Sequence, residues 1–115
     1  MVAEKLHAMV LLGTRNSRMK DYFDLRALAR EGALDLNRLA KAIAATFARR
    51  KTALPAVVPS GLSDEFARDA TSQAQWSAFL TRNRLEGPAF AEVVEEVREF
   101  IAEPMRGARL GLPAA

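Results

Sequence analysis

Cysteine is missing from all 115 residues of this sequence, and histidine occurs once, as His7. Without cysteine the chain can form no disulfide, no thiolate nucleophile and no cysteine-ligated metal site. A single histidine excludes a histidine-rich metal centre and argues against a Ser-His-Asp catalytic triad. We therefore predict no metal ligands in this sequence.

Long hydrophobic runs are missing too. No apolar stretch approaches the length of about 18 residues that a membrane-spanning helix needs. The N-terminal segment MVAEKLHAMV carries an acid, Glu4, and lacks the long apolar core of a signal peptide. We therefore expect a cytoplasmic protein without a membrane partner.

The sequence does contain a large apolar fraction and a small excess of positive charge. Hydrophobic residues make up 50% of the chain, whose length suits one domain with one core. The formal net charge is +3. This charge permits contact with nucleic acid or nucleotide phosphates but does not require it.

Apolar residues recur at helical spacing along most of the sequence, and no segment alternates as a strand would. We predict an all-α fold: a single helical bundle of about five helices in residues 1–104, followed by a flexible tail at 105–115. The predicted helices cover residues 2–12, 18–30, 36–50, 73–84 and 88–103, with a short helical turn at 64–68.

Capping residues and helix breakers set these boundaries. Gly13 and Gly32 are predicted to end the first two helices, and Pro104 is predicted to end the last. Asp35 and Ser63 are suited to begin the third helix and the short turn.

Two further caps are predicted. Asn16 and Ser17 can cap the second helix, and Ser72 with Gln75 has the spacing of a capping box. Because the connection at 13–17 is short, the first two helices are predicted to pack as an antiparallel hairpin.

The densest group of charges lies at the start of the second predicted helix. Asp21 and Asp24 are three residues apart and therefore share a helical face, which Leu25 makes partly apolar. A carboxylate on such a face needs a partner, and Arg18 or Lys5 can supply it. The pattern is compatible with a buried ion pair that locks the hairpin, or with the edge of a phosphate or metal site.

Other charged side chains have structural explanations. Lys5 shares a face with Met9 and Leu12, which is typical of a lysine with a buried stem and a solvated ammonium group. His7 lies off that stripe and is expected at the surface or an interface. The basic run at 49–51 suits the last turn of a helix, although phosphate binding is the alternative.

Two segments, VAEKLHAM and NSRMKDYFDLRAL, resemble the AbiEii family of bacterial nucleotidyltransferase toxins. That family has an E-K-x-x-A motif followed by an S-R-x-K-D-x-x-D-L motif on consecutive helices. The residues that match these motifs are Glu4, Lys5, Ala8, Ser17, Arg18, Lys20, Asp21, Asp24 and Leu25. The segments ATFARRKTALP and QWSAFL are also similar, so the resemblance extends to about residue 101.

The resemblance implies roles for these side chains. Lys5 and Asp21 are the implied catalytic residues, the lysine contacting nucleotide phosphates and the aspartate orienting it. The implied supporting residues are Glu4, Arg18, Lys20 and Asp24. Mg²⁺ and a nucleoside triphosphate are implied for the full-length family, and no cofactor is assigned to this chain itself.

The sequence also departs from the family, because it contains no D-x-D carboxylate pair of the kind that holds Mg²⁺ in the catalytic domain. We therefore interpret it as the helical C-terminal portion of a nucleotidyltransferase toxin from a toxin–antitoxin or phage-defence system, inactive by itself. The implied partners are a missing N-terminal catalytic domain or a separate chain supplying it, an antitoxin, a tRNA acceptor and a second copy of the chain.

Two alternatives stay open at this point. The chain can be a stand-alone helical module that binds a partner protein or nucleic acid. It can also be a decayed gene product that folds without a function.

Overall fold

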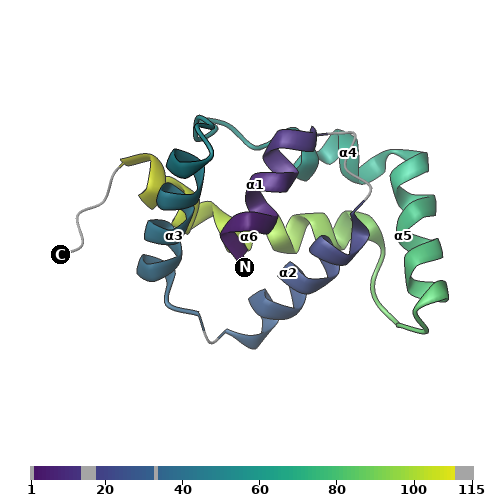
Figure 1. Ribbon diagram of the computed structural model, residues 1–115. Helices are drawn as coiled ribbons and strands as arrows, with labels where there is room; N and C mark the ends of the chain where they lie inside the picture. The colour runs from purple at the N-terminus through teal and green to yellow at the C-terminus, as the bar shows by residue number, and fades with distance from the viewer. Residues whose placement is uncertain (1, 14–17, 33, 111–115) are drawn as a thin grey trace.

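The computed structural model describes residues 2–13, 18–32 and 34–110, and that part of the chain is all helical, without a strand (Figure 1). The helices are α1 (Val2–Leu12), α2 (Met19–Glu31), α3 (Leu36–Arg49), α4 (Asp64–Arg68), α5 (Ala70–Arg82) and α6 (Phe90–Leu110), with a 3-10 turn, η2 (Ser60–Leu62), before α4. The all-α prediction is confirmed. None of the described helices is long and apolar enough to cross a bilayer.

Helix α6 is the element on which most of the others pack. Figure 1 shows it running behind α1, α2 and α3, and it contacts α2, α3, α4 and α5. Its apolar stripe is buried, as its helical spacing predicts. The buried residues of this stripe are Phe90, Val93, Val94, Val97 and Ile101.

Helix α1 lies between α2 and α3, and its contact with α3 is the more extensive. Leu6 and Met9 of α1 are completely buried, which fixes the helix on the core. In Figure 1, α1 and α2 run in opposite directions. The charged residues that join these two helices form the site considered below.

Four of the predicted helix ends are confirmed. Gly13 and Gly32 have φ of +54° and +67°, a conformation that glycine adopts without strain, and the Gly32 N–H donates to Leu28 O. The Asp35 and Ser63 side chains accept hydrogen bonds from backbone N–H groups in the first turns of α3 and α4.

The predicted capping box at Ser72 and Gln75 is wrong. Helix α5 begins earlier and is capped by Asp69, whose carboxylate accepts from both the backbone N–H and the hydroxyl of Ser72. A carboxylate is the stronger acceptor here because it also interacts favourably with the helix dipole. The predicted caps Asn16 and Ser17 lie outside the described residues.

The predicted end of the last helix at Pro104 is also wrong, since α6 continues through this proline. Pro104 removes one helical hydrogen bond, but Met105 and Ala108 beyond it are buried in the core. Burial of these apolar side chains offsets the loss. Residues 105–110 of the predicted tail are therefore helical, while 111–115 lie outside the described residues.

A close contact between η2 and the first two helices fixes the centre of the molecule. The hydroxyl of buried Tyr22 donates to Gly61 O at 2.7 Å, and its ring packs edge-to-face on Phe90. A Cβ atom on Gly61 would lie 3.0 Å from Met9 O and 3.2 Å from the Tyr22 oxygen. Only glycine therefore allows η2 to approach both helices this closely.

We predict that Gly61→Ala lowers the free energy of unfolding by about 1–3 kcal/mol, because the added methyl group meets backbone atoms of a packed helix. Gly87→Ala is the matched control, since its Cβ would find only ordinary contacts, 3.5 Å and more, with Leu80 and Trp76. We expect the control to change stability by less than about 1 kcal/mol. Urea unfolding followed by circular dichroism measures both, and equal effects would contradict the close approach.

Candidate functional site

Helices α1 and α2 are joined at Lys5, whose ammonium group lies between two carboxylates. Its Nζ is 2.9 Å from Asp21 Oδ1 and 3.2 Å from Asp24 Oδ2. The two aspartates share one face of α2, so a single lysine from α1 reaches both. The sequence predicted Arg18 or Lys5 as the partner of a carboxylate on this face, and Lys5 contacts both aspartates.

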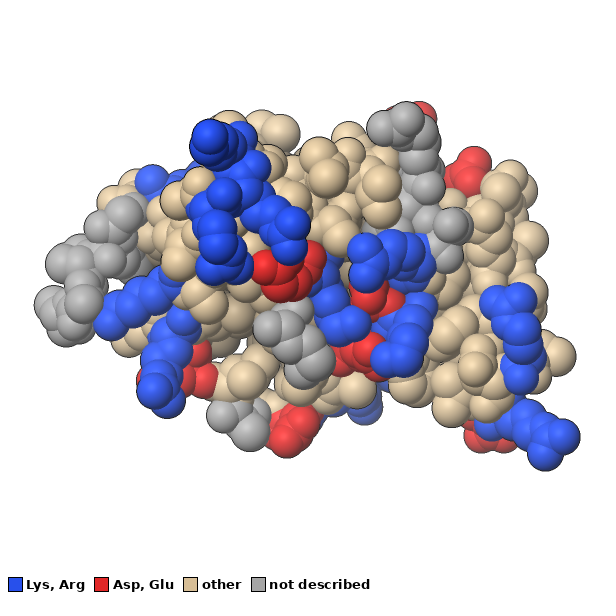
Figure 2. Space-filling model, viewed as in Figure 1, with Lys and Arg blue, Asp and Glu red and all other residues tan. Residues whose placement is uncertain are grey.

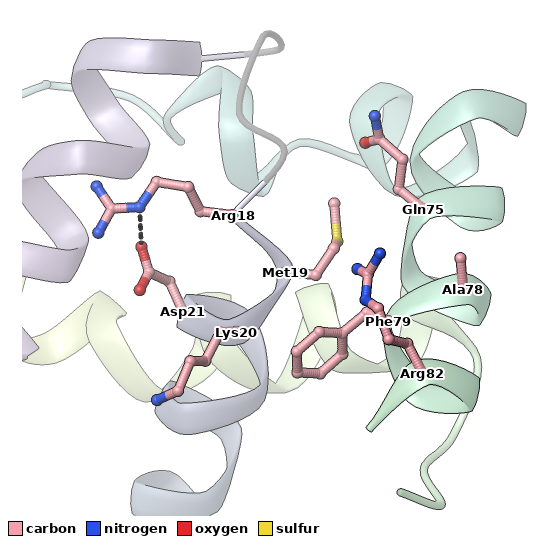
Figure 3. Close-up of a pocket in the computed structure, with 8 residues that line it drawn as sticks. All are labelled: Arg18, Met19, Lys20, Asp21, Gln75, Ala78, Phe79 and Arg82. Carbon is pink, nitrogen blue, oxygen red and sulfur yellow. Dashed lines mark ion pairs between the residues drawn. The ribbon is translucent and has the colours of Figure 1, made fainter. Parts of the chain in front are cut away.

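Two further cations complete what we call the Lys5 cluster: Lys5, Arg18, Lys20, Asp21 and Asp24. Arg18 Nε lies 3.1 Å from Asp21 Oδ2 (Figure 3), and Lys20 Nζ lies 2.7 Å from Asp24 Oδ2. Three cations therefore surround two carboxylates. Figure 3 shows Arg18 and Asp21 together on one side of α2, turned away from α5.

Asp21 is the most enclosed member of the Lys5 cluster. Its side chain is 5% exposed, against 15% for Lys5 and 26% for Asp24. Arg18 approaches Asp21 Oδ2 within ion-pair distance, but this buried oxygen has no hydrogen bond with the described part of the chain. The charge of Arg18 is therefore what stabilises this oxygen in its buried position.

The ion pairs of the Lys5 cluster shift the pKa values of Lys5 and Asp24. Burial lowers the pKa of Lys5, but the hydrogen bonds and charges of Asp21 and Asp24 outweigh it and hold this pKa above its ordinary value. Burial raises the pKa of Asp24, but hydrogen bonds from Lys20 and Lys5 outweigh it and lower this pKa. Lys5 is therefore a fixed cation at neutral pH and not a general base.

Glu4 lies next to Lys5 in the sequence but points to a different helix. Its two carboxylate oxygens lie 2.9 Å from Arg49 and 2.8 Å from Arg50, at the end of α3. Burial raises the pKa of Glu4, and the hydrogen bonds from the two arginines outweigh this effect and lower it. The structure thus assigns Glu4, Arg49 and Arg50 to an ion-pair contact between α1 and α3, and it does not place Glu4 in the Lys5 cluster.

His7 was expected at the surface or an interface, and the structure excludes the surface. The residue is buried, with its ring edge-to-face on Phe47 and its Nε2 atom 2.8 Å from Thr52 Oγ1. The Thr52 hydroxyl donates to Arg50 O, so its oxygen accepts a hydrogen bond from His7 Nε2–H. The signal for this burial was a second apolar stripe on α1, in which Ala3 precedes His7 by one turn and faces α3.

A groove of about 520 Å³ borders the Lys5 cluster on the α1 side, and we call it the α1 groove. Three cations, Lys5, Arg18 and Arg50, and one carboxylate, Glu4, line it. Leu11 and Leu12 supply apolar surface at the same place. Figure 2 shows Lys and Arg atoms directly beside Asp and Glu atoms on this face, over the region where Figure 1 places α1 and α2.

A second groove, of about 540 Å³, lies between α2 and α5 (Figure 3). Met19 and Phe79 form its apolar part, and Arg82 of α5 lies at its edge. Arg18 and Asp21 line this groove as well, so the two grooves meet at the Lys5 cluster. Phosphate groups that enter either groove would meet a positive charge.

The described residues do not fit a magnesium site. In residues 2–13, 18–32 and 34–110, no three His, Asp or Glu side chains lie together as metal ligands would. Asp21 and Asp24, the two carboxylates that lie together, are already occupied by Lys5, Arg18 and Lys20. A magnesium ion prefers several oxygen ligands in octahedral geometry, which this cluster does not offer.

Comparison with known protein families gives a match that covers most of the chain. The family described as "Nucleotidyl transferase AbiEii toxin, Type IV TA system" matches residues 1–101 of the 115. No curated protein and no solved structure matches the chain. The matched range includes the whole Lys5 cluster.

Substitutions in the Lys5 cluster test whether its ion pairs stabilise the folded chain or whether apolar residues could replace them without loss of stability. We predict that Lys5→Met lowers the free energy of unfolding by about 3 kcal/mol, because it leaves Asp21 buried without its main partner. The double variant Lys5→Met/Asp21→Leu is expected to regain wild-type stability, since an apolar pair needs no desolvation. The control Lys20→Met, at an exposed lysine, should cost less than about 1 kcal/mol. If the double variant is instead less stable than either single variant, the ion pairs of the cluster serve to stabilise the packing of α1 on α2.

The lowered pKa of Asp24 predicts how stability depends on pH. A carboxylate whose pKa is lower in the folded chain stabilises it above the unfolded-state pKa, and this contribution is lost as the pH falls through the folded-state pKa. Asp24→Asn should therefore lose less stability than the wild type between about pH 5 and pH 2. Urea unfolding at several pH values tests this, with Glu99→Gln, at an exposed carboxylate, as the control. If the free energy of unfolding falls equally with pH in the wild type and in Asp24→Asn, the lowered pKa of Asp24 does not contribute to stability.

Proposed function

The chain belongs to the AbiEii nucleotidyl transferase toxin family, and on this premise we propose that its Lys5 cluster holds the phosphates of a nucleoside triphosphate during nucleotide transfer. Lys5 contacts the phosphate oxygens from the α1 groove. Asp21 and Asp24 hold its ammonium group in position, and Arg18 and Lys20 form ion pairs with the two carboxylates.

One observation carries this proposal: a nearly enclosed lysine is held by two carboxylates at the edge of a groove that other cations line. An ammonium group has three N–H donors. Asp21 and Asp24 account for two contacts of Lys5, which leaves a third donor for a phosphate oxygen. Because the raised pKa keeps Lys5 protonated, its contribution is a fixed positive charge that needs no reorganisation when the ligand binds.

This charge suits the chemistry of nucleotide transfer. In that reaction an acceptor hydroxyl loses its proton and forms a bond to the α-phosphorus, and the bond between that phosphorus and the oxygen of the leaving pyrophosphate breaks. Negative charge grows on the phosphate oxygens as this happens, and positioned cations stabilise it. Lys5 and Arg18 are the side chains that we assign to this task.

The carboxylates that would hold Mg²⁺ must come from outside the described residues, because those residues do not fit the ion. We propose that they belong to a further part of the toxin or to a separate chain, and that these 115 residues are inactive without them. A family of toxins implies an antitoxin partner. We propose tRNA as the acceptor and phage defence in the cytoplasm as the setting.

Titration calorimetry with GTP, CTP and ATP tests the phosphate-binding role of Lys5. We expect the double variant Lys5→Met/Asp21→Leu to bind the preferred triphosphate about tenfold or more weakly than the wild type, because a charge-assisted hydrogen bond contributes about 1.5–3 kcal/mol. Lys41→Met, at an exposed lysine of α3, is the matched control and should bind normally.

Two results would contradict the proposal. Equal affinity of the folded double variant and the wild type would remove Lys5 from the site. Transfer of label from a nucleoside triphosphate to total tRNA by these 115 residues with Mg²⁺, above the level of a Lys5→Ala control, would show that no further carboxylates are needed.

A further inference from the structure

A third groove lies between the segment 56–59 and the C-terminal half of α6. It measures about 320 Å³, and we call it the C-terminal groove. It shares no residue with the Lys5 cluster or the two grooves beside it. Its function is therefore independent of the one proposed above.

The floor of the C-terminal groove is apolar and open to solvent. Val57 is 78% exposed and Val58 is 51% exposed, and both line the groove together with Ile101 and Met105 of α6. Because they are largely exposed, these two adjacent valines do not contribute to the hydrophobic core. Apolar surface of this kind, bordered by charges, is typical of interaction sites.

The backbone presents these valines outward. Residues 53–58 make no backbone–backbone hydrogen bond with the described part of the chain, so helical or sheet structure does not place them. Pro55 and Pro59 bracket the segment, and each fixes its own φ. Buried Pro59 anchors one end, which leaves Val57 and Val58 on a short, restrained projection over α6.

Arginine alone supplies the charge of the C-terminal groove. Arg98 donates to Leu62 O and Asp64 Oδ1, so it helps to hold α6 against η2 and α4. Arg106 and Arg109 are exposed and form no ion pair with the described residues. No acidic side chain lines the groove. Cations near the C-terminal end of a helix interact favourably with its dipole. This interaction does not explain the exposed apolar residues on the floor of the groove.

We propose that the C-terminal groove docks a segment of a partner protein in which an aliphatic or aromatic side chain is flanked by carboxylates. The apolar side chain covers Val57, Val58 and Met105, and the carboxylates pair with Arg106 and Arg109. Arginine forms bidentate pairs with carboxylates, which gives such a contact direction as well as attraction.

Two other occupants fit the groove less well. A second copy of this chain would bring Arg106 and Arg109 against the same two residues, and like charges oppose that contact. The phosphates of a nucleic acid could pair with the arginines. Its bases would find no partner on the apolar floor, because no aromatic side chain lines the groove for a base to stack on.

The test uses three fluorescein-labelled dodecapeptides and a single-stranded RNA of 12 nucleotides, titrated with the whole chain by fluorescence anisotropy. The first peptide carries two leucines flanked by four glutamates, the second replaces the glutamates with lysines, and the third replaces the leucines with serines. We expect the first peptide to bind at least about tenfold more tightly than the other two, since it alone offers both the apolar side chain and the carboxylates.

Two double variants locate the binding. Val57→Ser/Val58→Ser and Arg106→Glu/Arg109→Glu are each expected to weaken binding of the first peptide about tenfold or more. The control Arg38→Glu/Arg68→Glu reverses two exposed arginines elsewhere and gives the same net charge as the second variant, and it should bind normally. The residues of all three substituted pairs are exposed, so the variants should fold.

Several outcomes would overturn the proposal. They are absence of peptide binding, equal binding of the glutamate–serine peptide, or preferential binding of the RNA that the arginine reversal abolishes. A dimer in sedimentation experiments that Val57→Ser/Val58→Ser converts to a monomer would instead assign the groove to contact between two copies.

Discussion

Burial of the Lys5 ammonium group between α1 and α2 is a free-energy cost that the surrounding residues must offset. Asp21 and Asp24 do so from one face of α2, and Arg18 and Lys20 then neutralise the two carboxylates. The balance is incomplete, because one oxygen of Asp21 lacks a hydrogen bond with the described residues. The ion pair of that oxygen with Arg18 offsets part of this cost.

The rest of the fold holds this cluster in place. Helix α6 packs against α2 and α3, while the ion pairs of Glu4 with Arg49 and Arg50 fix the start of α1 to the end of α3. The hydrogen bond from Tyr22 to Gly61 O ties α2 to η2. Because these contacts come from several packed helices, the fold itself sets the position of Lys5.

Binding surfaces occupy two separate parts of the molecule. The Lys5 cluster and its two grooves belong to the region that the AbiEii family model matches, whereas part of the C-terminal groove lies beyond residue 101. The first region combines carboxylates with cations and suits phosphate chemistry. The second combines cations with exposed aliphatic surface, a pairing that suits a protein segment and that phosphate binding does not need.

The sequence by itself determined the features that depend on residues close together in the chain. Helical periodicity gave the helices, Gly13, Gly32, Asp35 and Ser63 marked their ends, and the three-residue spacing of Asp21 and Asp24 placed both on one face for Lys5.

Only the tertiary structure decided the features that depend on distant packing. His7 is buried because α3 and Thr52 cover a second face of α1. Helix α6 continues through Pro104 because Met105 and Ala108 reach the core. In both cases, burial against residues far away in the sequence outweighed a local preference that favours the surface or a helix end.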